Sequence, residues 1–114
     1  MAFVYLIGEE ANEGNFKIGV TTEKTIEKRM KKLQTGNSNK LIIRKYYETD
    51  KPFKLETMLH NFYKNKNILN EWFYLTNEEV EQFISVCDKY EKIMICLKNN
   101  YFFNKKKIIN QGFS

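Results

Sequence analysis

The chain has 114 residues, the usual size of one domain, so we expect a single hydrophobic core and a single functional face. Hydrophobic residues make up 42% of it and charged residues 29%, a balance that argues against a disordered chain, and no apolar run is long enough to span a membrane. The formal net charge of +5 favours a polyanionic partner such as DNA, although an A/T-rich genome would produce the same surplus of lysine beside asparagine.

The first strands are predicted from short apolar and aromatic runs. Residues 3–7 and 16–20 form two such runs, and the polar segment between them, residues 8–15, contains glycine and suits a hairpin loop. Residues 41–48 are rich in branched and aromatic side chains. The sequence therefore predicts two antiparallel strands at the start of the fold and a third strand later.

One helix is predicted before the third strand in the sequence and one after it. Thr22 is placed to cap the first, over residues 23–34, and Gly36 follows where a left-handed C-terminal cap is expected. Pro52 suits the first turn of the second helix. The apolar residues of that helix recur at helical spacing and should pack on the sheet: Leu55, Met58, Leu59, Phe62 and Tyr63.

An aromatic segment and a third helix follow. Residues 71–75 are too aromatic for an exposed loop and should return to the core. Thr76 and Glu79 have the spacing of a capping box, and the apolar stripe after them predicts a helix. We expect an α+β domain over residues 1–98, with a three-stranded antiparallel sheet flanked by helices in the order strand, strand, helix, strand, helix, helix. A basic, mobile tail is expected over residues 99–114.

Two cysteines, Cys87 and Cys96, limit the redox and metal chemistry. They form no CxxC pair, and the single histidine cannot complete a zinc set. On a helix their separation would point the thiols to opposite sides, so neither a disulfide nor a zinc site is expected. With no signal-like segment at the amino terminus, these features predict a protein of the cytoplasm, or of the nucleus if the host has one.

Several short motifs occur in a characteristic order along the chain. They are Phe3-Val4-Tyr5, Lys17-Ile18-Gly19, Arg29, Leu33-Gln34-Thr35-Gly36-Asn37, Glu56 with His60, and Glu71-Trp72-Phe73. This order resembles the GIY-YIG nuclease superfamily, and especially its phage-type branch, found in phages, large DNA viruses and fungi. The resemblance covers residues 3–75 and departs from the family twice: Phe3-Val4 replaces Gly-Ile of the first motif, and Lys17 replaces the second tyrosine.

The resemblance implies a metal-dependent endonuclease that hydrolyses DNA phosphodiester bonds. It makes Glu56 the sole carboxylate ligand of one divalent cation, Mg²⁺ or Mn²⁺, and no acidic cluster supports a second metal. Arg29 would hold a phosphate through its planar guanidinium. Tyr5 would activate or orient water once a neighbouring positive charge lowered its pKa. The competing readings are a solvated carboxylate, an ordinary surface arginine and a core tyrosine.

The remaining candidates would support that reaction. Lys17 would supply a positive field or contact phosphate, and Lys28 and Lys32 would bind the DNA backbone beside Arg29. His60 lies four residues after Glu56 on the same helix face, so it would protonate the leaving group, relay a proton or hold Glu56. A solvent-facing lysine and a surface Glu-His pair remain the alternatives for Lys17 and His60.

Three functions stay open at this point. Besides the endonuclease, the chain could be a DNA-binding domain with little cleavage, because Lys17 replaces a tyrosine near the scissile phosphate. It could also be a small regulatory module that binds a protein partner through its third helix and tail. Asn70 and Glu71 either support a metal or turn the chain before Trp72, and a homodimer is left open.

Overall fold

A computed structural model describes the backbone of residues 2–110 and the side chains of residues 2–97. In chain order the elements are β1 (Ala2–Glu9), β2 (Asn12–Thr21), α1 (Ile26–Thr35), β3 (Leu41–Thr49), α2 (Pro52–Phe62), the 3-10 helix η1 (Lys64–Lys66), β4 (Asn67–Leu69), β5 (Trp72–Tyr74) and α3 (Asn77–Asn110). The strands form one antiparallel sheet in the order β3-β1-β2-β5-β4. The predicted α+β class is therefore confirmed.

The sheet has five strands, so the predicted three-stranded sheet is wrong. The two additional strands, β4 and β5, form a hairpin, and β5 pairs with residues 15–17 of β2. Each has only three residues, which is too short to show the alternation that predicts a strand. The expected return of residues 71–75 to the core is confirmed for Phe73 and Leu75, which are 1% and 2% exposed, whereas Tyr74 is 57% exposed.

The β1–β2 hairpin is longer than its apolar runs. Most of the polar segment expected as a loop, residues 8–15, belongs to the two strands, and Glu9 pairs with Asn12 after a bulge. Backbone groups form these pairs whatever the side chains are, so polar residues at the exposed end of a sheet extend the ladder. The apolar pattern therefore predicted only the part of each strand that packs against the helices.

Both predicted caps of α1 are wrong in detail. The side chain of Thr21 accepts a hydrogen bond from Glu23 N at 3.0 Å, a local turn that delays the helix. The N-cap is consequently Thr25 rather than Thr22, and its hydroxyl accepts from Lys28 N at 3.3 Å. At the other end Gly36 has φ −92° and ψ 10°, so the cap is not left-handed.

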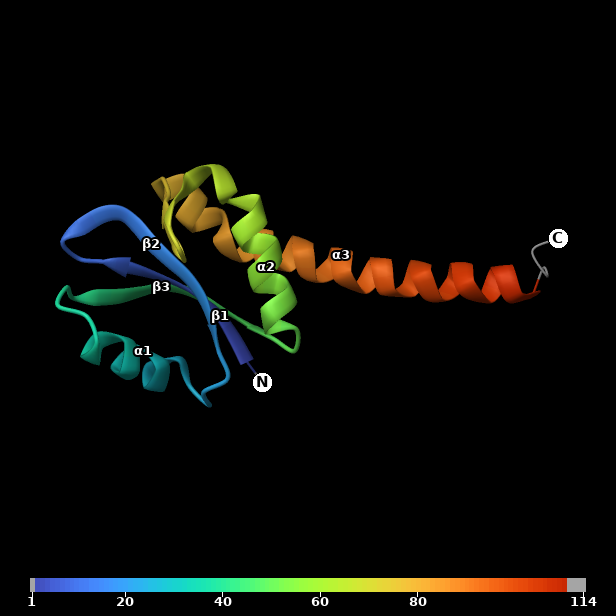
Figure 1. Ribbon diagram of the computed structural model, residues 1–114, viewed down its shortest axis with the longest axis horizontal. Helices are drawn as coiled ribbons and strands as arrows, with labels where there is room; N and C mark the ends of the chain where they lie inside the picture. The colour runs from blue at the N-terminus through green and yellow to red at the C-terminus, as the bar shows by residue number, and fades with distance from the viewer. Residues whose placement is uncertain (1, 111–114) are drawn as a thin grey trace.

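Each face of the sheet buries a core. Val4 and Leu6 face the cluster formed with α2 and α3, whereas Tyr5 and Ile7 face the cluster formed with α1. Successive side chains of a strand alternate between the two faces, so one strand serves both cores. Figure 1 shows α1 on one side of the strands, with α2 and the beginning of α3 on the other.

The second helix packs mostly as its stripe predicts. Pro52 occupies its first turn, and Leu55, Leu59 and Tyr63 are buried against the sheet. Phe62 is the exception, because 49% of it is exposed where the helix ends. The stripe therefore identified the buried face correctly except at its last turn.

The third helix begins at the predicted capping box. Glu79 N donates to the Thr76 hydroxyl at 3.2 Å, and Thr76 N donates to the Glu79 carboxylate at 2.9 Å. Cys87 is buried, Cys96 is exposed, and both are free thiols. The helix continues through residues 99–110, and residues 111–114 of the expected tail lie outside the described residues. The division into a domain and a mobile tail stays a prediction.

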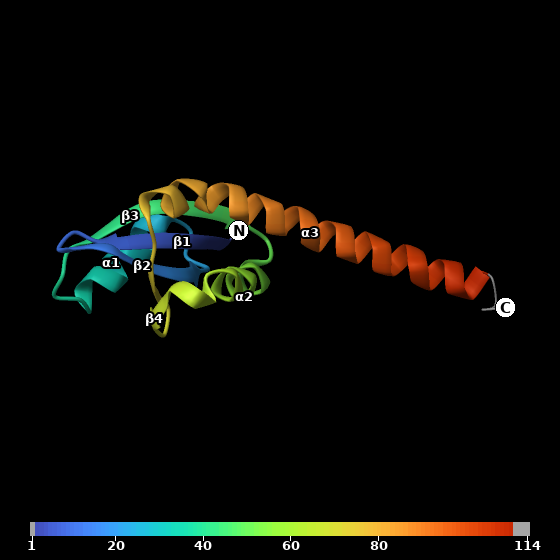
Figure 2. The same cartoon turned by 90° about the horizontal axis from the view of Figure 1, so that it is seen from above.

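Figure 2 shows α3 extending away from the sheet along the long direction of the molecule. Among the residues that the structure describes, no helix combines the length and the apolar character that crossing a bilayer requires.

Candidate active site

Tyr5 and Gly19 form the floor of the candidate site. They lie opposite each other on β1 and β2, and Tyr5 is 1% exposed. A Cβ atom on residue 19 would lie 2.6 Å from Tyr5 Cζ, closer than side chains approach one another. Because Gly19 has no side chain, the Tyr5 ring can pack directly against its backbone.

Arg29 approaches the same ring from α1. Its Cζ atom lies 6.0 Å from the centroid of the Tyr5 ring. Arg29 Nε is buried without a hydrogen-bond partner, one of two such side-chain atoms in the described part of the chain. A buried donor of this kind is costly unless something accepts its hydrogen bond. An acceptor placed beside Tyr5 would satisfy this donor.

Tyr5 remains a neutral phenol in this setting. Burial raises the pKa of Tyr5, and the opposing effect of Arg29, by hydrogen bonding and by charge, is smaller. Arg29, one of the positive charges expected to lower this pKa, acts in that direction, but in the protein alone removal from water outweighs it. A neutral hydroxyl can orient water by donating or accepting a hydrogen bond.

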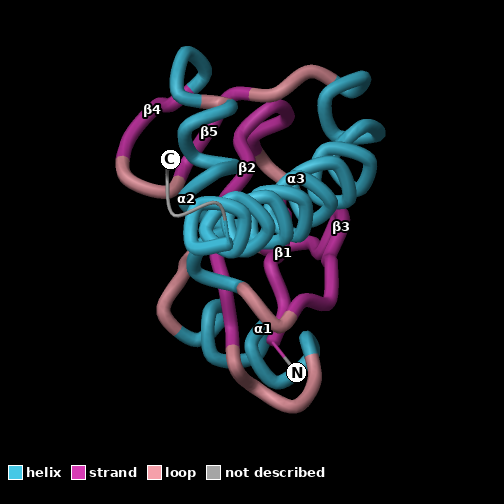
Figure 3. Tube along the Cα trace, turned by 90° about the vertical axis from the view of Figure 1, so that its right-hand side faces the viewer, coloured by secondary structure: helices cyan, strands magenta, loops and turns pink. Residues whose placement is uncertain are grey.

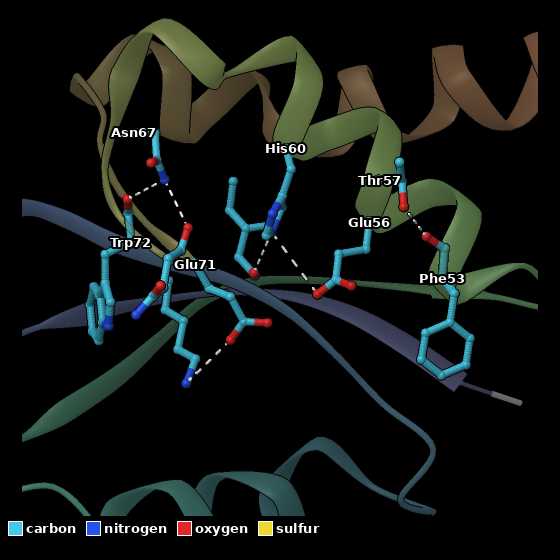
Figure 4. Close-up of polar contacts among 10 residues, drawn as sticks. Phe53, Glu56, Thr57, His60, Asn67, Glu71 and Trp72 are labelled. Carbon is cyan, nitrogen blue, oxygen red and sulfur yellow. Dashed lines mark hydrogen bonds and ion pairs between the residues drawn. The ribbon is translucent and has the colours of Figure 1, made fainter.

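His60 is fixed by the backbone of β2. Its Nε2 atom lies 2.9 Å from Ile18 O, and because a carbonyl only accepts, Nε2 donates the hydrogen. The ring edge also contacts the Phe73 ring at a centroid distance of 5.0 Å. His60 Nε2 lies 4.0 Å from Glu56 Oε2, and Figure 4 shows both side chains reaching from α2 toward β2. His60 thus ties α2 to the strand that carries Lys17.

Glu71 brings a second carboxyl group to Glu56. Burial is the main cause that raises the pKa of Glu56; His60 opposes it, and Glu71 adds to it by repulsion and by hydrogen bonding between the carboxyls. Figure 4 shows the two carboxyl groups turned toward each other. Lys17 Nζ lies 3.6 Å from Glu71 Oε2, so Glu71 lies between a lysine and a carboxylate. Lys17 is consequently not a freely solvated lysine.

Asn70 and Glu71, for which the sequence left a turn role and a metal role open, differ in the structure. Asn70 has φ 51°, the left-handed conformation that turns the chain from β4 to β5. Glu71 follows, and its backbone oxygen accepts from Ile18 N at 3.0 Å. The only sequence signal for Glu71 was its place in the Glu-Trp-Phe motif, and propensity alone favoured a turn residue.

The predicted residues divide into two groups on either side of the β2 edge. Tyr5 and Arg29 lie with the α1 core, whereas Glu71 from the β4–β5 hairpin and Glu56 and His60 from α2 approach β2, where Lys17 pairs with Glu71. The negative charges of Glu71 and Glu56 both raise the pKa of Tyr5, so the groups are electrostatically coupled. Lys28 and Lys32 lie exposed on α1, and Lys32 forms an ion pair with Glu23.

The carboxyl groups fit a hydrated hard cation better than a closed metal site. Among the described residues, no group of three or more His, Cys, Asp and Glu side chains could hold a metal ion. Glu56 and Glu71 offer carboxylate oxygens, the ligands that Mg²⁺ takes while it keeps several waters. A cation would also neutralise the repulsion between these two carboxyls.

The His60 contact can be tested by two substitutions that differ in hydrogen bonding. We expect His60→Leu to lower the free energy of unfolding by about 1–3 kcal/mol, because Ile18 O loses its donor in a half-buried place. His60→Gln retains an amide donor of similar reach and should lose less. Urea unfolding at neutral pH measures both. Equal losses would mean that the hydrogen bond does not stabilise the site.

Comparison with known proteins gives one family. A family model described as the T5orf172 domain matches residues 2–88. The match runs from β1 into α3, so it includes every strand and every residue of the candidate site described above. No curated protein and no solved structure matches the chain.

Proposed function

The chain belongs to the T5orf172 domain family, and from this premise we propose that it is a DNA endonuclease of the GIY-YIG type that depends on Mg²⁺ or Mn²⁺. Family membership suggests a nuclease-like or DNA-binding role and an association with viruses or phages. The observation that carries the finer proposal is that Glu56, with His60 and Glu71 beside it, is coupled electrostatically to Tyr5, whose ring Arg29 approaches.

Phosphate binding is assigned to the α1 side of the site. The unpartnered Arg29 Nε would donate to a phosphate oxygen, and the guanidinium charge would strengthen that hydrogen bond. Lys28 and Lys32 are exposed on the same helix and would attract the flanking DNA backbone. The net charge of +5 supports the same partner.

Metal binding is assigned to Glu56, with Glu71 beside it. The cation, when bound, would neutralise phosphate charge and polarise the bond that breaks. His60 would act on Glu56 by electrostatic attraction and not by a hydrogen bond, because its Nε2 hydrogen is committed to Ile18 O and Glu56 Oε2 lies 4.0 Å away. The commitment of this hydrogen to a backbone carbonyl speaks against Nε2 as the proton donor to a leaving group.

Water would be positioned by Tyr5. Its buried, neutral hydroxyl is influenced by the charges of Arg29, Glu71 and Glu56, and it would hold a water by hydrogen bonding. Lys17 would act indirectly, because its ammonium group is paired with Glu71, the carboxylate beside Glu56. Different residues would thus bind the phosphate, hold the cation, position the water and align the site.

A second function, DNA binding without efficient cleavage, is favoured by one specific observation. The residue that replaces the family's second tyrosine, Lys17, forms an ion pair with Glu71 at 3.6 Å. A lysine in this pair cannot supply the hydroxyl that a tyrosine would. Binding through Arg29 and the α1 lysines would remain.

The proposed endonuclease should nick supercoiled plasmid DNA in Mg²⁺ or Mn²⁺ and not in chelator. The physical reason is that two half-buried carboxyls need a cation before a phosphate can approach them. Agarose gels follow the nicking, and fluorescence anisotropy across a salt series follows binding. Salt-dependent binding without metal-dependent nicking would support the second function instead. If the protein neither nicks nor binds DNA, both the endonuclease and the DNA-binding function are contradicted, and the protein-interaction module remains.

A further inference from the structure

The β4–β5 hairpin presents apolar side chains to solvent at the margin of the molecule. Ile68 is 51% and Leu69 65% exposed, and all three residues of β4 are exposed. Figures 2 and 3 show the β4 segment at the outer edge, beyond β2 and β5. Neighbouring exposed apolar residues on a protruding turn are typical of an interaction surface.

The hairpin is held rigid from within. Asn67 Nδ2 donates to Asn70 O at 2.8 Å and to Trp72 O at 3.1 Å, so one side chain closes the turn. Asn70 adopts the left-handed conformation that the turn requires. Leu69 is therefore presented by a prearranged turn, which reduces the entropy lost on binding.

A second protein strand is a poor partner for this edge. β4 has three residues, and its pairing with β5 is interrupted between Asn67 and Leu69. Adding a strand needs a longer, regular row of free backbone groups. The exposed side chains, rather than the backbone, are thus the recognition feature.

Charge and position favour DNA. The short helix η1 precedes β4 directly and exposes Lys64 and Lys66, although Lys66 also lies 3.7 Å from Glu79. The turn leads into Glu71, whose carboxyl is part of the candidate active site. A duplex bound at that site would pass the hairpin.

We propose that Leu69, with Ile68 beside it, is a wedge that enters the base stack of duplex DNA next to the cleavage site. This inference rests on the proposed DNA function and adds a preference to it. Inserting an apolar wedge costs unstacking of a base step, and the cost is smallest where the stack is already broken. The protein consequently prefers duplexes with a bulge, mismatch or branch.

Leu69→Ser is the direct test, and Leu97→Ser is its matched control. Leu97 is an equally exposed leucine, at 60%, on α3. Wild type should bind a duplex with a one-base bulge about tenfold more tightly than the intact duplex, measured by anisotropy in chelator so that the DNA is not cut. A 2-aminopurine beside the bulge should brighten on binding as it unstacks. Leu69→Ser should reduce the preference to within about twofold and abolish the brightening, while Leu97→Ser behaves as wild type.

Several outcomes overturn the inference. If Leu69→Ser keeps the preference for the bulge, the wedge is excluded even when wild type binds and nicks DNA. If Leu69→Ser instead converts a dimer to a monomer in sedimentation, the surface covers a second copy of the chain. If wild type neither binds nor nicks DNA, both the proposed wedge and the proposed endonuclease function are contradicted. Circular dichroism melting confirms that both exposed-site variants are folded.

Discussion

Glu56→Gln should lower the rate of plasmid nicking by roughly a thousandfold, because the variant loses the carboxylate assigned to the cation, whose stabilisation of transition-state charge is worth several kcal/mol. The side chain keeps its size, and DNA affinity in chelator should stay within about threefold of wild type. Nicking in Mg²⁺ and anisotropy in chelator measure the two quantities separately.

The same substitution should not weaken the fold. Burial and the neighbouring Glu71 both disfavour a charged Glu56, so a neutral amide is expected to leave the free energy of unfolding equal or slightly higher. Glu48→Gln, an exposed carboxylate on β3 two strands away from β2, is the matched control and should nick as wild type. Full activity of Glu56→Gln would remove Glu56 from the proposed mechanism, and a large loss of stability would show that its role is structural.

Gly19→Ala should lower the free energy of unfolding by about 1–3 kcal/mol and disturb the site at the same time. The added Cβ would approach Tyr5 Cζ to 2.6 Å, and the buried ring can yield only by moving into its packed neighbours. Urea unfolding gives the stability change. The near-ultraviolet circular dichroism of the native variant should change as Tyr5 moves, and nicking should fall.

Gly36→Ala provides the control for adding a methyl group. A Cβ at residue 36 would meet no atom within 4 Å, and its φ of −92° is open to alanine. Its stability should therefore be unchanged, or raised by about 0.4–1 kcal/mol through the unfolded chain. If both glycine variants lose the same stability, close packing against Tyr5 is not the reason that residue 19 is glycine.

The parts of the fold that the sequence predicted are those with a local signal. The apolar stripe of α2 and the capping box of α3 are such signals, and each identified its helix without reference to the rest of the chain. A three-residue strand such as β4 has no such repeat, and its pairing depends on where α2 delivers the chain. Two local hydrogen bonds set the start of α1: the Thr21 hydroxyl holds a turn at Glu23, and the helix is capped by Thr25 after it.

The candidate site shows the same limit. Motif order selected Tyr5, Arg29, Glu56 and His60, but the burial that raises the pKa of Tyr5 and of Glu56 depends on the packed structure. The hydrogen bond that orients His60 is accepted by a backbone carbonyl, and because every residue has one, the residue pattern could not predict it. Glu71 looked like a turn residue because its partners, Lys17 and Glu56, are distant in sequence.

The peptide groups of Ile18 have a consequence for how this site can evolve. Its N–H donates to Glu71 O and its C=O accepts from His60, so one residue of β2 joins the hairpin to α2. These atoms are common to all residue types except that proline lacks the N–H. An apolar residue that fits the buried place of Ile18 would keep both hydrogen bonds, whereas proline would remove the one that the Ile18 N–H donates. The alignment of the site therefore depends on backbone atoms that such conservative substitutions leave in place.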